Sequence, residues 1–271
     1  MAKPKVFVIY YSTYGHVHTL AQSVMKGVSK SGDVDVEMYQ FAETLPDDIL
    51  EKMHAVPKPN VPIIDVDKIS EADGVLIGFP TRFGTAPAQV KAFFDATGKL
   101  WSSGALVGKC AGLFFATGSQ HGGQESTVYS FLPHLAHHGM IYVPLGYPSP
   151  YMFENDSVIG GSAWGAGTVA GSDGSLQPNY KELDIAEIQG EKFASVVAKL
   201  ATVSSNKDQK VAAGGVPEAD AVPKESAVEH NTAVEPSANA KPAAEIAPTN
   251  PPAPASKNPI RRLINKLKNA L

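Results

Sequence analysis

In two segments of the chain, an apolar run ends at residues that bear hydroxyl groups and at glycine. The first is VFVIYYSTYGH, residues 6–16, and the second is GVLIGFPTRFGTAPAQVKAFFD, residues 74–95. A buried strand that ends in such a loop and leads into a helix binds anions, because the loop offers backbone N–H groups and the helix N-terminus carries about half a positive charge. Two such strand ends form a nucleotide crevice where the strand order of a parallel sheet reverses.

The first loop is the candidate phosphate site. It consists of Ser12, Thr13, Tyr14, Gly15, His16 and Val17. It is neither the dinucleotide fingerprint nor a Walker loop, because no lysine follows its glycine. Two hydroxyls, a glycine and a helix N-terminus would instead bind a monophosphate without a cation. The alternative is an ordinary helix N-cap at Ser12 or Thr13.

Two further loops strengthen the case for a ligand site. Thr81, Arg82 and Phe83 follow the second strand end, where a threonine is available for hydrogen bonds and the longer side chains could lie along a flat ring. The alternative there is a turn with a surface arginine. A third loop, ATGSQHGGQES over residues 116–126, has glycines that allow a planar ligand to approach the backbone. All three loops would emerge on one edge of the sheet.

Three other side chains have both a ligand-binding and a structural interpretation. His137 and His138 are adjacent near a predicted helix C-terminus, so they point in different directions and do not pair as metal ligands; each could be a polar cap. Trp101 is either an aromatic wall over a ligand or part of a small satellite core. The sequence contains no CxxC, HExxH or GxSxG motif, so we predict no metal and no catalytic nucleophile.

These loops need a scaffold of buried strands and amphipathic helices, and the hydrophobic pattern supplies it. The predicted strands cover residues 6–11, 34–41, 74–80, 110–117 and 140–144. The predicted helices cover residues 17–29, 87–97, 125–138 and 183–200, with a short one near 47–54. Residues 147–177 are rich in glycine and are predicted to form a long loop. Together they predict an α/β fold with a doubly wound, five-stranded parallel sheet of order 2-1-3-4-5.

Composition divides the chain into three parts. We predict a single domain over residues 1–203, a disordered Pro/Ala-rich linker over 204–256 and a basic amphipathic helix over 257–271. The net charge of −4 argues against a nucleic-acid binder. A single cysteine suits a reducing compartment, and with no leader peptide or apolar span visible we expect a cytoplasmic protein.

The C-terminal segment NPIRRLINKLKNAL has its own signature. Asn258 and Pro259 suit a helix start, and the apolar residues then recur on one face at helical spacing, with arginines and lysines mainly elsewhere. A short basic amphipathic helix on a long tether is typical of a peripheral anchor for an anionic membrane, here the cytoplasmic face of the plasma membrane. The alternative is docking on the protein's own domain or on a partner.

Several long motifs in order resemble those of one family. These are YYSTYGHV, GFPTRFGTAPAQVKAFFDATGKLWSSGAL, GGQES, LAHHGM, VPLGY and GTVAGSDGSLQPNYKELDIAEIQG. Over residues 3–200 the chain resembles the WrbA-type NAD(P)H:quinone oxidoreductases, which are flavodoxin-like FMN proteins, and its tail is similar to the extensions of fungal members. The resemblance implies a flavodoxin-like fold, bound FMN, and two-electron reduction of quinones by NADH or NADPH in protection against oxidative stress.

The resemblance also implies roles for individual residues. The loop of residues 12–17 would hold the FMN phosphate, and Thr81, Arg82 and Phe83 would line the isoalloxazine ring. The third loop would border the ring and its ribityl chain through Ala116, Thr117, Gly118, Ser119 and Gln120. His137 would reach the flavin of a neighbouring subunit in a dimer of dimers, Tyr14 would contact the nicotinamide, and Trp101 would contact the quinone.

Two departures from the family pattern concern the binding loops. The third loop reads ATGSQHGGQ where the family commonly has STGTGGGQ, so it is one residue longer and carries Gln120 and His121. Val17 stands where flavodoxins often have a hydroxyl. Two other functions remain open from the sequence: a membrane-associated flavodoxin-like adaptor with little turnover, and a one-electron flavodoxin. A single flavin face shared by NAD(P)H and quinone would imply ping-pong kinetics.

Overall fold

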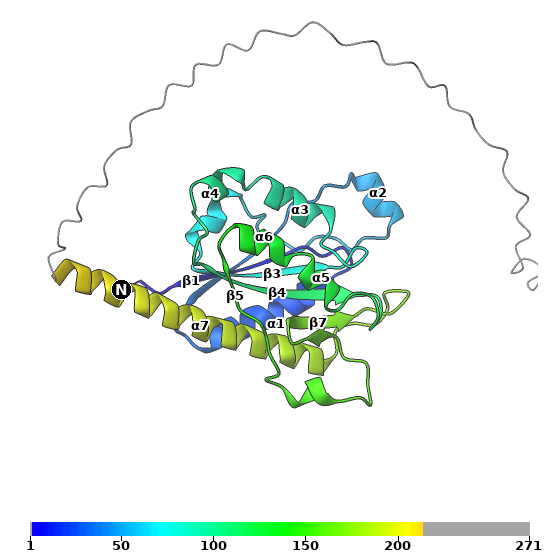
Figure 1. Ribbon diagram of the computed structural model, residues 1–271. Helices are drawn as coiled ribbons and strands as arrows, with labels where there is room; N and C mark the ends of the chain where they lie inside the picture. Colours follow the sequence, from blue (N-terminus) through cyan, green and yellow to red (C-terminus); the bar gives the residue numbers. More distant parts are fainter. Residues whose placement is uncertain (1, 214–271) are drawn as a thin grey trace, which may run out of the picture. The chain divides into compact units, whose positions relative to one another are not determined.

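Strand β1 lies inside a mainly parallel sheet that carries helices on both faces (Figure 1). The computed structural model describes residues 2–213. Its strands are β1 (Lys5–Tyr10), β2 (Asp35–Gln40), β3 (Gly74–Pro80), β4 (Cys110–Thr117), β5 (Ile141–Tyr142), β6 (Gly161–Ser162) and β7 (Gly165–Val169). Its α-helices are α1 (His16–Lys30), α2 (Asp47–Lys52), α3 (Ala88–Asp95), α4 (Gly98–Ser102), α5 (Ser126–Tyr129), α6 (Leu132–His137) and α7 (Tyr180–Ala213). Two 3₁₀ turns, η1 (Asp67–Glu71) and η2 (Pro150–Phe153), complete the elements.

The strand order is β2-β1-β3-β4-β7-β6, and β5 also pairs with β4. The predicted order of the first four strands is confirmed, and all of their pairings are parallel. The chain runs outward from β1 to β2 and then crosses back to β3 on the other side of β1. The order therefore reverses between β1 and β3, which is where a parallel α/β sheet opens a crevice for a ligand.

The fifth position of the sheet corrects the prediction, because two separate strands share it. β5 pairs with the first residues of β4 at Cys110 and Ala111, while β7 pairs with the last residues, Phe115 to Thr117. Residues 147–177, predicted to be a long loop, therefore contain η2, β6 and β7. Glycines concealed β7 from the hydrophobic pattern. A Cβ on Gly165 would lie 2.0 Å from the Leu113 carbonyl oxygen, so only glycine fits there.

Two helices also differ from their predicted bounds. The helix predicted over residues 125–138 is two short helices, α5 and α6, and Pro133 lies in the first turn of α6, where proline is tolerated. Helix α7 runs to Ala213, past residue 204, where the sequence predicted the linker to begin. Most of that linker and the whole predicted helix at 257–271 lie outside the described residues.

The hydrophobic core is divided between the two faces of the sheet. Phe7 and Ile9 of β1 point to the face covered by α3, α4, α5 and α6, where they join Phe93 and Phe131. The alternate residues of β1, including Val8, point to the face covered by α1 and α7. Because both faces are covered, the inner strands β1, β3 and β4 are apolar along almost their whole length, as their sequence predicted. The edge strand β2 is only partly buried and alternates polar with apolar residues.

Helices α1 and α7 pack unusually closely, side by side under the sheet (Figure 1). Gly27 of α1 and Gly190 of α7 are both buried, and each meets the backbone of the other helix. A Cβ on Gly27 would lie 1.9 Å from the Glu187 carbonyl oxygen, and one on Gly190 would lie 2.1 Å from that of Val24. The approach of α1 to α7 therefore requires glycine at both positions.

We predict that Gly27→Ala lowers the free energy of unfolding by about 1–3 kcal/mol, because a methyl group forces two helix backbones apart. The loss should occur although alanine is the better helix former by about 1 kcal/mol. Gly98→Ala in α4 is the control, since its added Cβ meets no atom within 4 Å. Urea unfolding followed by circular dichroism measures both. Equal midpoints for Gly27→Ala and wild type would contradict the close approach.

Candidate functional site

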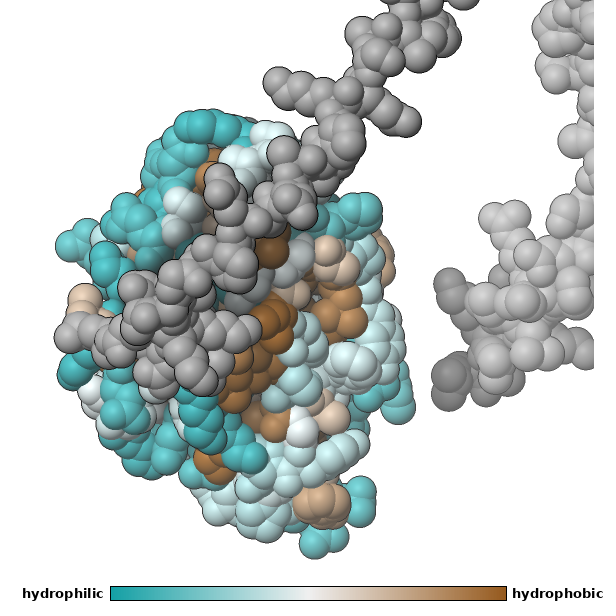
Figure 2. All heavy atoms as spheres, turned by 60° about the vertical axis from the view of Figure 1, so that its left-hand side comes forward, coloured by the Kyte–Doolittle hydropathy of each residue, from teal (hydrophilic) through white to brown (hydrophobic). Residues whose placement is uncertain are grey.

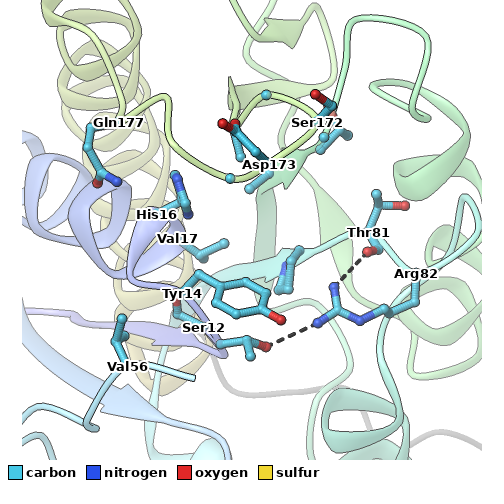
Figure 3. Close-up of a pocket in the computed structure, with 18 residues that line it drawn as sticks. Ser12, Tyr14, His16, Val17, Val56, Thr81, Arg82, Ser172, Asp173 and Gln177 are labelled. Atoms are coloured by element: carbon cyan, nitrogen blue, oxygen red, sulfur yellow. Dashed lines mark hydrogen bonds between the residues drawn. The ribbon is translucent and has the colours of Figure 1, made fainter. Parts of the chain in front are cut away.

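A cavity of about 510 Å³ opens at the carboxyl ends of β1, β3, β4 and β7 (Figure 3). It brings together ten of the residues predicted from the sequence. They are Ser12, Thr13, Tyr14, His16, Val17, Thr81, Arg82, Ala116, Thr117 and Gly118. The volume is in the range that holds a cofactor-sized ligand. The three predicted loops therefore meet at one place, as expected from parallel strands whose carboxyl ends share an edge.

The loop after β1 brings the N-terminus of helix α1 to the cavity. Gly15 has φ +89°, which favours glycine, and it starts helix α1. The Gly15 N–H donates to Ser12 Oγ at 3.1 Å, so this hydroxyl closes the loop. Within residues 2–213, the backbone N–H groups of His16 and Val17 have no hydrogen-bond acceptor. These donors belong to the first turn of a 15-residue helix, where the helix dipole also favours negative charge.

His16 is the second sign of an anion site. Its ring is 5% exposed, and its Nε2 is buried without a partner among the described residues. Figure 3 shows the ring at the cavity wall, between Val17 and Gln177. A buried ring nitrogen without a partner is costly, because it has lost its hydrogen bond to water. A ligand oxygen in the cavity would satisfy it.

Arg82 joins the first loop to the second. Its guanidinium donates to Thr13 Oγ1 at 3.1 Å and to the Thr81 carbonyl oxygen at 2.9 Å, as the dashed lines in Figure 3 show. The alternative interpretation of this loop, a turn with a surface arginine, is therefore wrong. The cationic group lies beside the phosphate loop and lines the cavity.

Thr81 links the second loop to the third. Its N–H donates to the Ala116 carbonyl oxygen at 2.8 Å, and its hydroxyl accepts from Thr127 Oγ1 at 2.8 Å and from the Gly84 N–H at 3.1 Å. These bonds hold the backbone of both loops at the cavity edge. The Thr81 loop is thus tied to the third loop and to α5 by hydrogen bonds.

A fourth loop, residues 170–174, follows β7 and lines the cavity, and it was not predicted from the sequence. The Ala170 N–H donates to the Thr117 carbonyl oxygen at 2.8 Å, which fixes this loop to the third. Figure 3 shows Ser172 and Asp173 across the cavity from Tyr14. Hydrogen bonds from Ser175 lower the pKa of the Asp173 carboxyl, so this group is anionic. The sequence GSDG is typical of a turn, but the pattern before it does not reveal a strand, so the sequence did not predict a loop at the sheet edge here.

Three other cavity residues were not predicted, namely Pro80 at the end of β3, Val56 and Gln177. Val56 and Gln177 come from segments without clear periodicity. The Val56 N–H donates to the Thr13 carbonyl oxygen at 3.1 Å, which attaches the segment after α2 to the phosphate loop. No sequence signal pointed to Val56 or Gln177, because their place depends on where irregular chain crosses the sheet edge.

Six predicted site residues do not line this cavity in the single chain, and one of them, Gly15, lies in the first loop between two residues that do. Phe83 is fully exposed with φ +54°, and Trp101 in α4 is 58% exposed. Ser119 follows the cavity residues of the third loop, and Gln120 lines a separate cavity with Tyr147 and Asn155. His137 lies in a small hollow with Phe94 and His134 on α6.

His138, next to His137, is buried, and its Nε2 lies 2.8 Å from Thr97 Oγ1. Burial and the neighbouring histidines lower its pKa. His138 is the C-cap residue of α6, so the polar cap that the sequence offered as an alternative is confirmed for this histidine. Among residues 2–213, no cluster of three histidine, cysteine or acidic side chains has the arrangement of a metal site. None of the helices in this range combines the length and hydropathy needed to cross a bilayer.

Known proteins share both the sequence and the fold. Residues 4–150 match the family described as NADPH-dependent FMN reductase. The chain is 52% identical over 202 residues to quinone-oxidoreductase QR2 of Triphysaria versicolor, covering 74% of this chain and 98% of that protein. It is 51% identical over 199 residues to NAD(P)H quinone oxidoreductase YCP4 of Candida albicans, covering 72% and 69%.

A solved structure supports the fold. The flavodoxin, WrbA-like protein from Agrobacterium tumefaciens aligns with a TM-score of 0.52 at 22% identity, over 73% of this chain and 99% of that one. The flavodoxin-like fold predicted from the sequence is thereby confirmed. The chain belongs to the NADPH-dependent FMN reductase family, and the predicted kinship with the NAD(P)H quinone oxidoreductases is confirmed by its curated relatives.

Proposed function

We propose that this protein is an FMN-dependent NAD(P)H:quinone oxidoreductase. One observation carries the proposal: the loop of residues 12–17 faces a cavity large enough for a flavin mononucleotide with N–H groups and a His16 Nε2 that have no partner among residues 2–213. The relatives that are half identical to this chain are named as quinone oxidoreductases.

The residues present fit FMN. Backbone N–H groups of His16 and Val17, the Ser12 and Thr13 hydroxyls and the Arg82 cation would receive the phosphate end. Thr81 and the backbone of residues 116–118 would border the ring. The sequence has no second phosphate motif, so FMN should bind better than FAD. When bound, FMN supplies the chemistry of accepting a hydride from NAD(P)H and passing two electrons to a quinone.

The protein's part in the reaction is to bind and orient. Tyr14 is 42% exposed at the cavity, and its hydroxyl donates to the Met53 carbonyl oxygen at 3.2 Å, which holds the ring in place for a flat nucleotide or quinone. Each reduction of a quinone by NAD(P)H takes up one proton, which water at the open cavity would supply, so no side chain must act as an acid or base. NAD(P)H and the quinone would use the same open face in turn, which produces ping-pong kinetics. Two-electron reduction avoids semiquinone release and so protects against oxidative stress.

The test of function is steady-state kinetics with purified protein. We expect a yellow protein that oxidises NADH or NADPH only when a quinone such as benzoquinone is present, with parallel lines in double-reciprocal plots. FMN binding without turnover would instead favour the adaptor function. Absence of both flavin binding and turnover would overturn the proposal.

We predict that Ser12→Ala with Thr13→Ala weakens FMN binding at least about tenfold, because it removes two hydroxyls that would contact a charged phosphate at roughly 1.5–3 kcal/mol each. Fluorescence titration of FMN measures the dissociation constant. Ser29→Ala is the control, since this hydroxyl donates to the Met25 carbonyl oxygen on the exposed side of α1. An unchanged constant in the double variant would sink the phosphate assignment.

Assembly is part of the proposal. Phe83, Trp101 and His137 lie outside the chain's own cavity, so they are available to complete the flavin and quinone sites of neighbouring subunits in a dimer of dimers. Exposed hydrophobic side chains such as Val107 and Ile141 also suit contact between subunits. Figure 2 shows hydrophobic residues gathered on one face of the molecule between hydrophilic margins. Analytical ultracentrifugation with FMN should show a dimer or tetramer, and a fully active monomer would refute this.

The C-terminal segment is proposed as a peripheral anchor on an anionic membrane, with the chain between helix α7 and residue 257 as its tether. Each basic residue near such a surface contributes about 1 kcal/mol. Liposome co-sedimentation should retain the full chain more than a chain ending at Ser256. Equal sedimentation of the two, or binding that is indifferent to Leu263→Asp with Leu267→Asp, would exclude the anchor.

A further inference from the structure

A polar network lies behind the phosphate loop, outside the cavity, and Glu43 is at its centre. Glu43 follows β2, and its side chain is 19% exposed. One carboxylate oxygen, Oε1, accepts from Gln89 Nε2 at 2.7 Å and from the Thr44 and Leu45 N–H groups at 3.0 and 3.2 Å. The other, Oε2, accepts from the Tyr11 hydroxyl at 2.9 Å and lies 3.1 Å from Lys58 Nζ.

Two of these donors reach the phosphate loop. Lys58 Nζ donates to the Ser12 carbonyl oxygen at 2.8 Å and lies 4.5 Å from the centre of the Tyr11 ring. The Tyr11 hydroxyl accepts from Thr13 Oγ1 at 3.4 Å. The same Thr13 oxygen accepts from Arg82 at 3.1 Å. The carboxylate is therefore connected to the loop backbone through Lys58 and to the cationic side chain through Tyr11 and Thr13.

The donors and the cation around Glu43 explain why a carboxylate occupies the centre of the network. The groups described above around the two oxygens are all donors, and one of these donors is a cation. Burial by itself would raise the pKa of Glu43, but the hydrogen bonds from Gln89, Leu45, Lys58 and Tyr11 outweigh burial and lower it to about 2. Glu43 is thus ionised at neutral pH and acts as the acceptor for the donors around it.

We propose that Glu43 is a positioning residue for the phosphate end of the cofactor, acting through Lys58 and Tyr11 on the loop of residues 12–17 and on Arg82. It does not line the cavity, so it would act on the loop's shape and not on the ligand. This inference rests on the proposed FMN site. A preorganised loop binds phosphate more tightly because less conformational freedom is lost on binding.

The decisive variant is Glu43→Gln, which keeps the side chain's size and removes its charge. The amide has only one oxygen, so its NH₂ group must face donors. These donors are either Gln89 Nε2 or the Lys58 and Tyr11 groups. We expect the dissociation constant of FMN to rise at least about tenfold. The dissociation constant of riboflavin, which has the same ring and no phosphate, should change less than about twofold. The ratio of the two constants is the readout, because a general loss of structure would weaken both ligands.

Glu187→Gln is the matched control. Glu187 on α7 has a similarly buried side chain, 17% exposed, and pairs with two lysines, Lys26 and Lys30. Its contacts join α7 to α1 and do not include the phosphate loop. This variant should lose some stability to thermal unfolding while both flavin dissociation constants stay unchanged.

A double-mutant cycle identifies the path. Lys58→Met and Tyr11→Phe should each weaken FMN binding, and each should add less than its full effect in the Glu43→Gln background, because the three residues act as one unit. Full additivity would overturn the proposal, as would a Glu43→Gln variant that binds FMN as tightly as wild type or that loses FMN and riboflavin equally. If wild type and Glu187→Gln bind neither flavin, it is the proposed function that fails.

Discussion

The parallel pairing of β1 with β3 is the constraint on which the site depends. Because β1 lies between β2 and β3, the connections after β1 and β3 leave the sheet toward opposite faces, and their first residues separate above the strand ends. The phosphate loop then begins at one side of the opening and the Thr81 loop at the other. Arg82 spans the gap between them, and β4 and β7 bring two more loops to the same edge. A different strand order would scatter the same residues.

Groups with partial and full positive charges lie around the opening of the cavity and favour a negatively charged ligand there. Unpaired N–H groups and the dipole of α1 provide a partial positive charge, and Arg82 provides a full one. Lys58 stands behind the loop, where Glu43 balances its charge. This balance matters because an unpaired ammonium group in a partly buried place would be costly. Asp173 on the fourth loop is the anionic group of the cavity, and it lies away from the phosphate loop (Figure 3).

Close packing of backbones positions the elements that form this site. Gly27 and Gly190 let α1 approach α7, which fixes the axis of the helix whose N-terminus faces the cavity. Gly165 does the same for β7 against Leu113, and the fourth loop follows directly from that strand. Glycine thus serves two needs here: positive φ at Gly15, and space for another backbone at the three packing positions.

Much of this protein follows from its sequence alone. The apolar strands, their interruption at hydroxyls and glycine, and the helical stripes predicted the sheet, its first four positions and three of the four loops, because these are local patterns of period 2 and 3.6. Only the tertiary structure decided the rest. Strand β7 was hidden because packing against Leu113 demands glycine where a strand normally shows β-branched residues. The Glu43 network joins residues 11, 13, 43, 58, 82 and 89, and no local pattern connects positions so far apart. Such contacts depend on where irregular chain crosses the sheet edge, which is settled by folding and not by periodicity.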